Sequence, residues 1–283
     1  MRATFQFLIA VFTVAVLVLG SCTHDRIRSA GRTRHYVLHV PESVAGSERP
    51  APLMLVFHGA GGSATGMREH TGLDAEADRL GYIVAYLEGS GVYRSWGSDQ
   101  IADVEFVEDL IEKLQRELPI NPDRMFAVGF SSGGRFVQRL ACDLGDRITA
   151  FASVSATMDR ATAVTCSTGH NVSALFVLGT DDPSVGWDAA TPPQPAHSLT
   201  AEEVMGHWVR INGCSATPEV SVLPEASGSD AGVERWEYPG CKAGTAVVLY
   251  VLTGQPHDWP QTIGTDSATA GGLITEFFES TNR

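Results

Sequence analysis

The chain has 283 residues, and its 43% of hydrophobic and 19% of charged residues are the proportions of a packed globular protein. Because 33 acidic residues outnumber 20 basic ones, the net charge is −13; a nucleic-acid partner is not expected, since phosphate binding needs a basic surface. The length suits one α/β domain behind a targeting segment and leaves no room for a second module.

The first 22 residues are expected to be an export signal. Residues 5–19 form an apolar stretch that is too short to span a bilayer comfortably. The stretch ends in Leu19-Gly20-Ser21-Cys22, which resembles a bacterial lipobox, in which the cysteine is lipidated and becomes the new N-terminus. We expect Cys22 to anchor the protein to a membrane surface outside the cytoplasm; simple secretion and an uncleaved anchor are the alternatives.

Polar and basic residues follow the signal, so residues 23–32 are expected to be a tether and residues 33–283 a single domain. Continuous apolar runs predict buried strands at residues 53–57, 82–86, 125–130, 150–155, 174–178 and 247–252. Helical patterns separate them, at residues 102–118, 132–144, 201–212 and 269–280. Strands that are apolar throughout suit a parallel sheet covered on both faces, so the alternation predicts a doubly wound α/β fold.

The segment Gly129-Phe130-Ser131-Ser132-Gly133-Gly134 is a G-x-S-x-G motif, directly after a predicted strand and directly before a predicted helix. In that context a serine nucleophile occupies a sharp turn, and small residues let the strand and helix approach closely. The backbone N–H of Ser132, at the start of the helix, can then face a developing oxyanion. We therefore expect Ser131 to be a nucleophile; the alternative is a chance occurrence of the pattern.

A second oxyanion donor is expected from the loop His58-Gly59-Ala60-Gly61-Gly62, which follows the predicted strand at residues 53–57. Glycine-rich backbone at this point can turn an N–H toward the active serine. The amide of Ala60 is the preferred donor, and that of Gly61 is the second choice. Taken alone, the loop would be an ordinary glycine-rich turn.

A serine nucleophile needs a histidine base that a carboxylate orients, and with this motif the chain order is Ser, Asp or Glu, then His. Of the histidines after Ser131, His257 lies in a loop directly after the last predicted strand and is the expected base. His207 falls within a predicted helix, while His170 and His197 lie in polar loops with no strand before them.

Two adjacent aspartates are candidates for the carboxylate. Asp181 and Asp182 follow the predicted strand at residues 174–178, and either could reach His257. The other one would then cap a turn. On the chain order alone, both stay open.

Together these motifs resemble those of the esterase and polyhydroxybutyrate depolymerase family of α/β-hydrolases, which includes feruloyl and acetylxylan esterases. The resemblance extends from about residue 34 to residue 259. The segments that carry it are residues 58–62, 103–107, 121–124, 129–134, 141–142, 179–185, 208–214, 241 and 254–260.

The resemblance implies an α/β-hydrolase fold for residues 33–283 and a serine carboxylic ester hydrolase that needs no cofactor. It favours Asp182 as the acid, because the family's acid is the aspartate of a Gly-Thr-x-Asp pattern, so the implied triad is Ser131, Asp182 and His257. Two departures weaken any transfer of substrate preference. Gln255-Pro256 stand where the family has a glycine-rich run, and Ser132 stands where many members have Asn or Ala.

Besides Cys22, the chain contains Cys142, Cys166, Cys214 and Cys241, and an even number in an exported chain suggests two disulfides. Three connectivities are possible. Pairing in chain order, Cys142 with Cys166 and Cys214 with Cys241, is preferred because the spacings are short. A metal site is not expected, since no CxxC or HxxxH pattern accompanies the cysteines.

The expected reaction is hydrolysis of a small or oligomeric carboxylic ester of feruloyl-polysaccharide, acetyl-polysaccharide or hydroxyalkanoate type, through an acyl-enzyme. Trp96 and Trp259 are candidates to line an acyl or aryl pocket, with core packing as the alternative. A serine peptidase of the same fold is a second possibility, although such enzymes usually carry a further domain. A non-catalytic surface binding protein is a third, and it would not react with a fluorophosphonate at Ser131.

Overall fold

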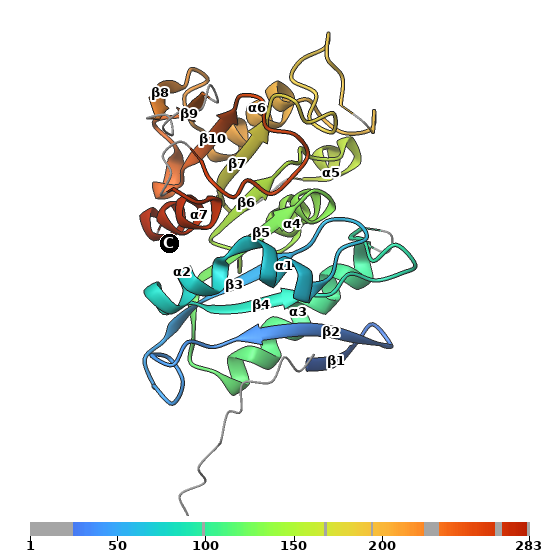
Figure 1. Ribbon diagram of the computed structural model, residues 1–283, viewed down its shortest axis with the longest axis vertical. Coiled ribbons are helices and arrows are strands. Elements are labelled where there is room, and N and C mark those ends of the chain that lie inside the picture. Colours follow the sequence, from blue (N-terminus) through green and yellow to red (C-terminus); the bar gives the residue numbers. More distant parts are fainter. Residues whose placement is uncertain are drawn as a thin grey trace, which may run out of the picture.

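The computed structural model describes residues 25–97, 100–166, 169–193, 195–223, 232–263 and 268–281 (Figure 1). The expected export signal, with Cys22, lies outside these residues. Within them, ten strands form one sheet in the order β1-β2-β4-β3-β5-β6-β7-β10-β9-β8. The strands are β1 (Asp25–Ser29), β2 (Arg32–His39), β3 (Ala51–Phe57), β4 (Ile83–Leu87), β5 (Ile120–Phe130), β6 (Ala150–Val154), β7 (Ser173–Gly179), β8 (Glu219–Leu223), β9 (Val233–Glu237) and β10 (Val247–Leu252).

The middle of the sheet is parallel, and its six strands are the six that the apolar runs predict. Neighbouring strands from β4 through β3, β5, β6 and β7 to β10 all pair in parallel. Every residue of β3, β4, β6 and β7 is buried, as expected of strands covered on both faces. Antiparallel strands extend the sheet at each side. The predicted α/β architecture is confirmed.

Helices cover the two faces of this sheet (Figure 1). On one face lie α3 (Gln100–Glu117), α4 (Ser132–Asp143) and α6 (Ala201–Asn212), which bury Leu110, Phe136 and Trp208 against it. On the other lie α1 (Ala64–Thr71), α2 (Leu73–Leu80) and α7 (Ala270–Ser280), which bury Met67 and Phe278. Two short helices, α5 (Arg160–Thr165) and the 3₁₀ helix η1 (Lys242–Gly244), complete the set. No helix of the described chain combines the length and hydropathy that a membrane span requires.

The prediction that residues 23–32 form a tether is wrong from Asp25 onward. Strand β1 pairs with β2 in antiparallel register and forms one edge of the sheet. The two strands are joined by Ala30 and Gly31, whose φ values of 48° and 72° are the two positive values that a tight hairpin turn requires. Exposed residues alternate with half-buried ones along β1, and composition alone does not distinguish such a polar edge strand from a linker.

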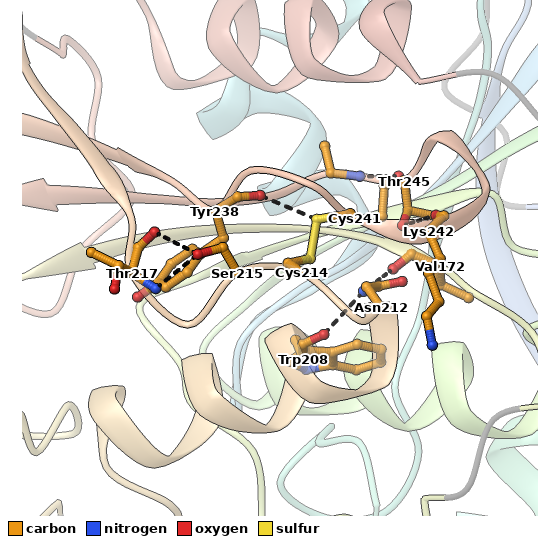
Figure 2. The surroundings of a disulfide bond; sticks show 12 residues. Val172, Trp208, Asn212, Cys214, Ser215, Thr217, Tyr238, Cys241, Lys242 and Thr245 are labelled. Carbon is orange, nitrogen blue, oxygen red and sulfur yellow. Dashed lines mark hydrogen bonds between the residues drawn. A yellow bond between two sulfur atoms is a disulfide. The ribbon is translucent and has the colours of Figure 1, made fainter.

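Both disulfides have the preferred connectivity. The Cys142–Cys166 bond joins α4 to the residue after α5, with the Cα atoms 5.1 Å apart. The Cys214–Cys241 bond joins the segment after α6 to the segment after β9 (Figure 2), with the Cα atoms 3.9 Å apart. Beside the second bond, the Asn212 side chain ends helix α6 by donating to the Val172 carbonyl at 3.0 Å and the Trp208 carbonyl at 3.2 Å (Figure 2).

A buried ion pair fixes the loop between β4 and α3. Arg34 of β2 lies 2.9 Å from Asp103 of α3, and their side chains are 5% and 0% exposed. The Arg34 guanidinium also stacks over the Phe106 ring, 4.2 Å from its centre. The second Asp103 oxygen accepts the Gly97 N–H at 3.0 Å, so the pair ties the end of this loop to the sheet.

Asp103→Ala is expected to lower the free energy of unfolding by about 3–5 kcal/mol, because it leaves the Arg34 charge buried without its carboxylate. Chemical denaturation followed by circular dichroism measures the change. Glu117→Ala is the matched control, since Glu117 pairs with Lys113 on an exposed part of α3 and such pairs contribute about 0–1 kcal/mol. Equal losses in the two variants would contradict this role of Asp103.

Candidate active site

Ser131 is the single residue between β5 and α4, and its backbone has φ 53° and ψ −114°. A positive φ is unfavourable for a residue with a Cβ, and strain of this kind is typical of a serine nucleophile at a strand–helix turn. Two backbone hydrogen bonds of 3.0 Å hold the turn: Ser131 N–H donates to the Val154 carbonyl of β6, and Arg135 N–H donates to the Ser131 carbonyl. The neighbouring strand and the first helical turn therefore fix where Ser131 lies.

The glycines of the motif are required by close backbone contacts. A Cβ at Gly129 would lie 2.2 Å from the Gly133 carbonyl oxygen, and a Cβ at Gly133 would lie 2.2 Å from the Phe57 carbonyl oxygen. A Cβ at Gly59 would come within 3.3 Å of the Ser131 Cβ. Strand β5, helix α4 and the loop after β3 therefore meet at Ser131 without room for side chains between them.

The structure places His257 within hydrogen-bond distance of both Ser131 and Asp182. Ser131 Oγ lies 2.9 Å from His257 Nε2, and His257 Nδ1 lies 2.9 and 2.8 Å from the two carboxylate oxygens of Asp182. The three residues come from the turn after β5, the loop after β7 and the loop after β10. Because these strands are parallel, their carboxyl ends share one edge of the sheet.

The carboxylate of this trio is enclosed, whereas its histidine is open to solvent. The Asp182 side chain is 0% exposed and the His257 side chain 34% exposed. Burial by itself raises the pKa of Asp182, but hydrogen bonds from His257 and Ser184 outweigh it and hold the pKa below its ordinary value. Asp182 is therefore a carboxylate at neutral pH and can accept the Nδ1 proton of His257.

Backbone contacts fix the Asp182 loop to the His257 loop. Thr180 N–H donates to the Leu252 carbonyl at 3.0 Å, and Thr180 Oγ1 accepts the Gly254 N–H at 2.8 Å. A Cβ at Gly179 would lie 2.1 Å from the Gln255 carbonyl oxygen, so only glycine fits there. The pairing of β7 with β10 and these backbone contacts thus set the distance between Asp182 and His257.

A neutral histidine, His58, hydrogen-bonds the glycine-rich loop after β3 to the residue Gly89 after β4. The Gly89 N–H donates to His58 Nε2 at 2.9 Å, so the ring proton is on Nδ1, which donates to the Gly59 carbonyl at 2.7 Å. Burial lowers the pKa of His58, in agreement with a neutral ring. The Trp96 indole donates to the His58 carbonyl at 3.0 Å.

The backbone N–H groups of Ala60 and Ser132, the predicted oxyanion donors, differ in their hydrogen bonding from that of Gly61, the second choice for the loop after β3. The Gly61 N–H donates to the Tyr93 carbonyl at 2.7 Å, so it is already engaged. Within the described part of the chain, the backbone N–H groups of Ala60 and Ser132 have no acceptor. Ser132 is the first residue of α4, where the N–H groups are left free by the helix.

The two tryptophans that were candidates for a substrate pocket lie in the core. Trp96 is 6% exposed and stacks on Phe136, with ring centres 5.2 Å apart. Trp259 is 2% exposed and belongs to the cluster beneath α1, α2 and α7. Neither ring offers a face to an acyl or aryl group, so we assign both to packing. The apolar indole rings that made these tryptophans candidates for a pocket are equally suited to the core.

The remaining candidates for acid and base contact groups other than Ser131 and His257. His207 is buried in α6, in edge-to-face contact with Trp208. His197 lies 3.4 Å from Asp159. Asp181 is exposed, and its carboxylate accepts from the neighbouring Thr180 hydroxyl at 3.2 Å.

One polar contact of this site was not predicted. Ser184, two residues after Asp182, places its hydroxyl 2.7 Å from Asp182 Oδ1 and 2.9 Å from His257 Nδ1. No sequence pattern indicates it, since a serine after Asp-Pro is also the usual composition of a turn.

A strained serine at a strand–helix turn, beside a histidine and a buried carboxylate at the carboxyl edge of a mostly parallel sheet, defines an α/β-hydrolase. Such an arrangement can activate the hydroxyl as a nucleophile. In the part of the chain described, no group of three or more His, Cys, Asp or Glu side chains is arranged to hold a metal ion.

Comparison with known proteins gives the family. No protein-family model matches the chain. The "Putative esterase NocK" of Nocardia uniformis subsp. tsuyamanensis is 32% identical over 262 residues, which are 85% of this chain and 75% of NocK. Feruloyl esterase B of Piromyces equi is 25% identical over 238 residues, which are 79% of this chain but only 42% of that protein. The chain belongs to this esterase family of α/β-hydrolases and is a carboxylic ester hydrolase.

A solved structure supports the fold. The acetyl xylan esterase from Aspergillus awamori superposes with a TM-score of 0.66, over 91% of this chain and 99% of the other. Its sequence is 11% identical, so this likeness concerns the fold alone.

Proposed function

We propose that Ser131, His257 and Asp182 are the nucleophile, general base and orienting acid of a serine esterase that works through an acyl-enzyme. The observation that carries the proposal is the pair of contacts on His257, at 2.9 Å to Ser131 Oγ and at 2.8 Å to Asp182. With Nδ1–H directed at the carboxylate, Nε2 is the free base that faces the hydroxyl.

In acylation, the Ser131 oxygen forms a bond to the ester carbonyl carbon while its proton moves to His257 Nε2. The tetrahedral intermediate carries its negative charge on the former carbonyl oxygen. When it collapses, the bond to the alcohol oxygen breaks, and His257 gives its proton to the leaving alcohol. Asp182 stabilises the imidazolium and takes no proton itself.

In deacylation, water takes the place of the alcohol. His257 removes a proton from the water, whose oxygen adds to the acyl carbon. Collapse then breaks the bond to Ser131, which regains its proton from His257, and the carboxylic acid is released.

Backbone amides are the proposed oxyanion donors. Ser132 directly follows Ser131, and Ala60 directly follows Gly59, where a Cβ would lie 3.3 Å from the Ser131 Cβ. Both backbone N–H groups lack an intramolecular acceptor within the described residues. Donors of this kind are effective because they are fixed before the charge develops. Gly61 is not retained as a donor, since its N–H is engaged by Tyr93.

For the substrate, we propose an ester of feruloyl- or acetyl-polysaccharide type, small or oligomeric. The names of two proteins similar in sequence, a feruloyl esterase and a bifunctional acetylxylan esterase/xylanase, support these two groups. A hydroxyalkanoate ester is the alternative that the sequence resemblance adds.

We also propose that the enzyme works outside the cytoplasm, anchored through a lipid on Cys22. Two disulfides in one domain support an oxidising compartment. Fractionation of wild type and a Cys22→Ser variant tests the anchor.

Labelling with a fluorophosphonate tests the nucleophile directly. Attack by the Ser131 oxygen on phosphorus expels fluoride, so we expect one adduct on the tryptic peptide of residues 125–135, with fragmentation assigning it to Ser131 rather than Ser132. Heat-denatured protein, in which the triad is dispersed, is the control and should not react. An adduct on a different serine, or none on folded protein, would refute the assignment. A panel of feruloyl, acetyl and hydroxybutyryl esters then identifies the acyl group.

A further inference from the structure

Ser184 contacts both members of the acid–base pair. Its hydroxyl lies 2.7 Å from Asp182 Oδ1 and 2.9 Å from His257 Nδ1, and its backbone N–H donates to the same Asp182 oxygen at 2.8 Å. The Ser155 carbonyl is a more distant neighbour of the hydroxyl, at 3.5 Å. One side chain therefore lies at the junction of carboxylate and imidazole.

The donors and acceptors of this junction can be assigned. An ionised carboxylate only accepts, so the single Ser184 hydroxyl proton goes to Asp182, its shortest contact. A lone pair of Ser184 Oγ is then left to face His257 Nδ1, which must carry a proton to donate to Asp182. The Nδ1–H is thus shared between two acceptors, Asp182 and Ser184.

We propose that Ser184 is a positioning residue for the triad. This inference rests on the proposed function, since the geometry matters for catalysis only if His257 is the base. A second acceptor at Nδ1 keeps the proton on that nitrogen, and Nε2 stays free to take the proton of Ser131. Donation to Asp182 also lowers the basicity of the carboxylate, so the imidazolium formed during the reaction keeps its Nδ1 proton.

The test compares Ser184→Ala with Ser184→Thr in steady-state hydrolysis of p-nitrophenyl acetate. Alanine removes both side-chain contacts, and we expect kcat to fall by about 10- to 100-fold, the cost of one hydrogen bond to a charged group. KM should change by less than about twofold, because a positioning residue acts through Asp182 and His257 and not through substrate binding. Threonine keeps the hydroxyl and should restore most of kcat. Ser221→Ala on the edge strand β8 is the matched control, since within the described chain its hydroxyl makes a single long contact, of 3.5 Å, to the Arg235 carbonyl.

A proton NMR measurement needs no ester. The His257 Nδ1–H should give a downfield resonance in wild type and Ser184→Thr, assigned by its absence in His257→Gln. In Ser184→Ala it should move and exchange faster with water, because one of its two acceptors is lost.

The outcomes separate this inference from the proposed function. If wild type carries the fluorophosphonate on Ser131 and Ser184→Ala keeps kcat within about twofold of wild type, the positioning role is refuted and the triad stands. A rise in KM at unchanged kcat would also refute it, because that is the signature of a substrate contact. If wild type is not labelled at Ser131, the proposed function fails; the inference then fails too if the Nδ1–H resonance is the same with and without the Ser184 hydroxyl.

Discussion

Ser131→Ala is expected to lower kcat for a short-chain ester by about 10⁴- to 10⁶-fold, the loss found when a triad nucleophile is removed from a serine hydrolase. The reason is that no other hydroxyl is held against His257 Nε2, which lies 2.9 Å from Ser131 Oγ within the described site. Alanine also fits the turn at least as well as serine does, because the strain arises from the Cβ at φ 53° and both residues carry one. The fold should therefore survive the substitution.

Initial rates with p-nitrophenyl acetate measure the effect, and far-UV circular dichroism with thermal melting verifies the fold. The Ser221→Ala variant, altered on the edge strand β8, should match wild type in both measurements. Substantial activity in folded Ser131→Ala would show that another residue performs the attack.

Asp182→Asn is expected to lower kcat by about 10⁴-fold at neutral pH, as the same change does in a serine protease triad. The Ser184 N–H and hydroxyl both donate to Asp182 Oδ1, so an asparagine would keep its oxygen there and turn its NH₂ group toward His257. An NH₂ group can only donate, so His257 would present Nδ1 as an acceptor and carry its proton on Nε2. That tautomer cannot accept the proton of Ser131.

The matched control is Asp181→Asn, the same change on the adjacent, exposed residue. Among the described residues, the partner of its carboxylate is the neighbouring Thr180 hydroxyl, so activity should stay within about tenfold of wild type. If Asp181→Asn lost activity and Asp182→Asn kept it, the acid would have to be reassigned.

The substitution Asp182→Asn should also change how the stability of the protein depends on pH in the acid range. The pKa of Asp182 is lower in the folded protein than its ordinary value of 3.8, so the folded state favours the ionised carboxylate. This stabilisation is fully present above that ordinary value and is lost as the pH falls through the lowered pKa. Urea unfolding of Asp182→Asn between pH 7 and pH 2 should therefore show a weaker dependence on pH than wild type in the acid range.

The parts of the structure that could be predicted are those where burial forces a single pattern. Strands covered on both faces must be apolar throughout, which is why the six parallel strands were recognisable from β3 to β10. His257 could be singled out because a base that reaches the turn after β5 must come from the carboxyl end of a nearby parallel strand. The short cysteine spacings likewise favoured the disulfide pairing that the structure has.

The parts that could not be predicted are half-exposed or depend on three-dimensional contacts. Strands β1 and β8 at the edges of the sheet lack the continuous buried run of the central strands, because β1 exposes two arginines and β8 exposes both polar residues and valines, so neither stands out from a loop. Trp96 looks the same in the sequence whether its ring faces a ligand or Phe136. The contact of Ser184 with His257 joins residues 73 positions apart, and only the pairing of β7 with β10 brings them together.

The pairing of β7 with β10 also lets most of the segment between these two strands change independently of the loops that carry Asp182 and His257. These strands are neighbours in the sheet, yet α6, β8, β9 and η1 lie between them in the chain (Figure 1). This segment starts at the carboxyl end of β7 and returns at the opposite end of the parallel strand β10, and its strands β8 and β9 extend the same sheet. The contacts of Thr180 with Leu252 and Gly254 join the carboxyl ends of β7 and β10 directly, without passing through the segment. An insertion or deletion within this segment need not alter the register of either strand. Evolution, or a protein engineer, can thus change the part of this segment that follows Ser184 while Asp182 and His257 keep their spacing.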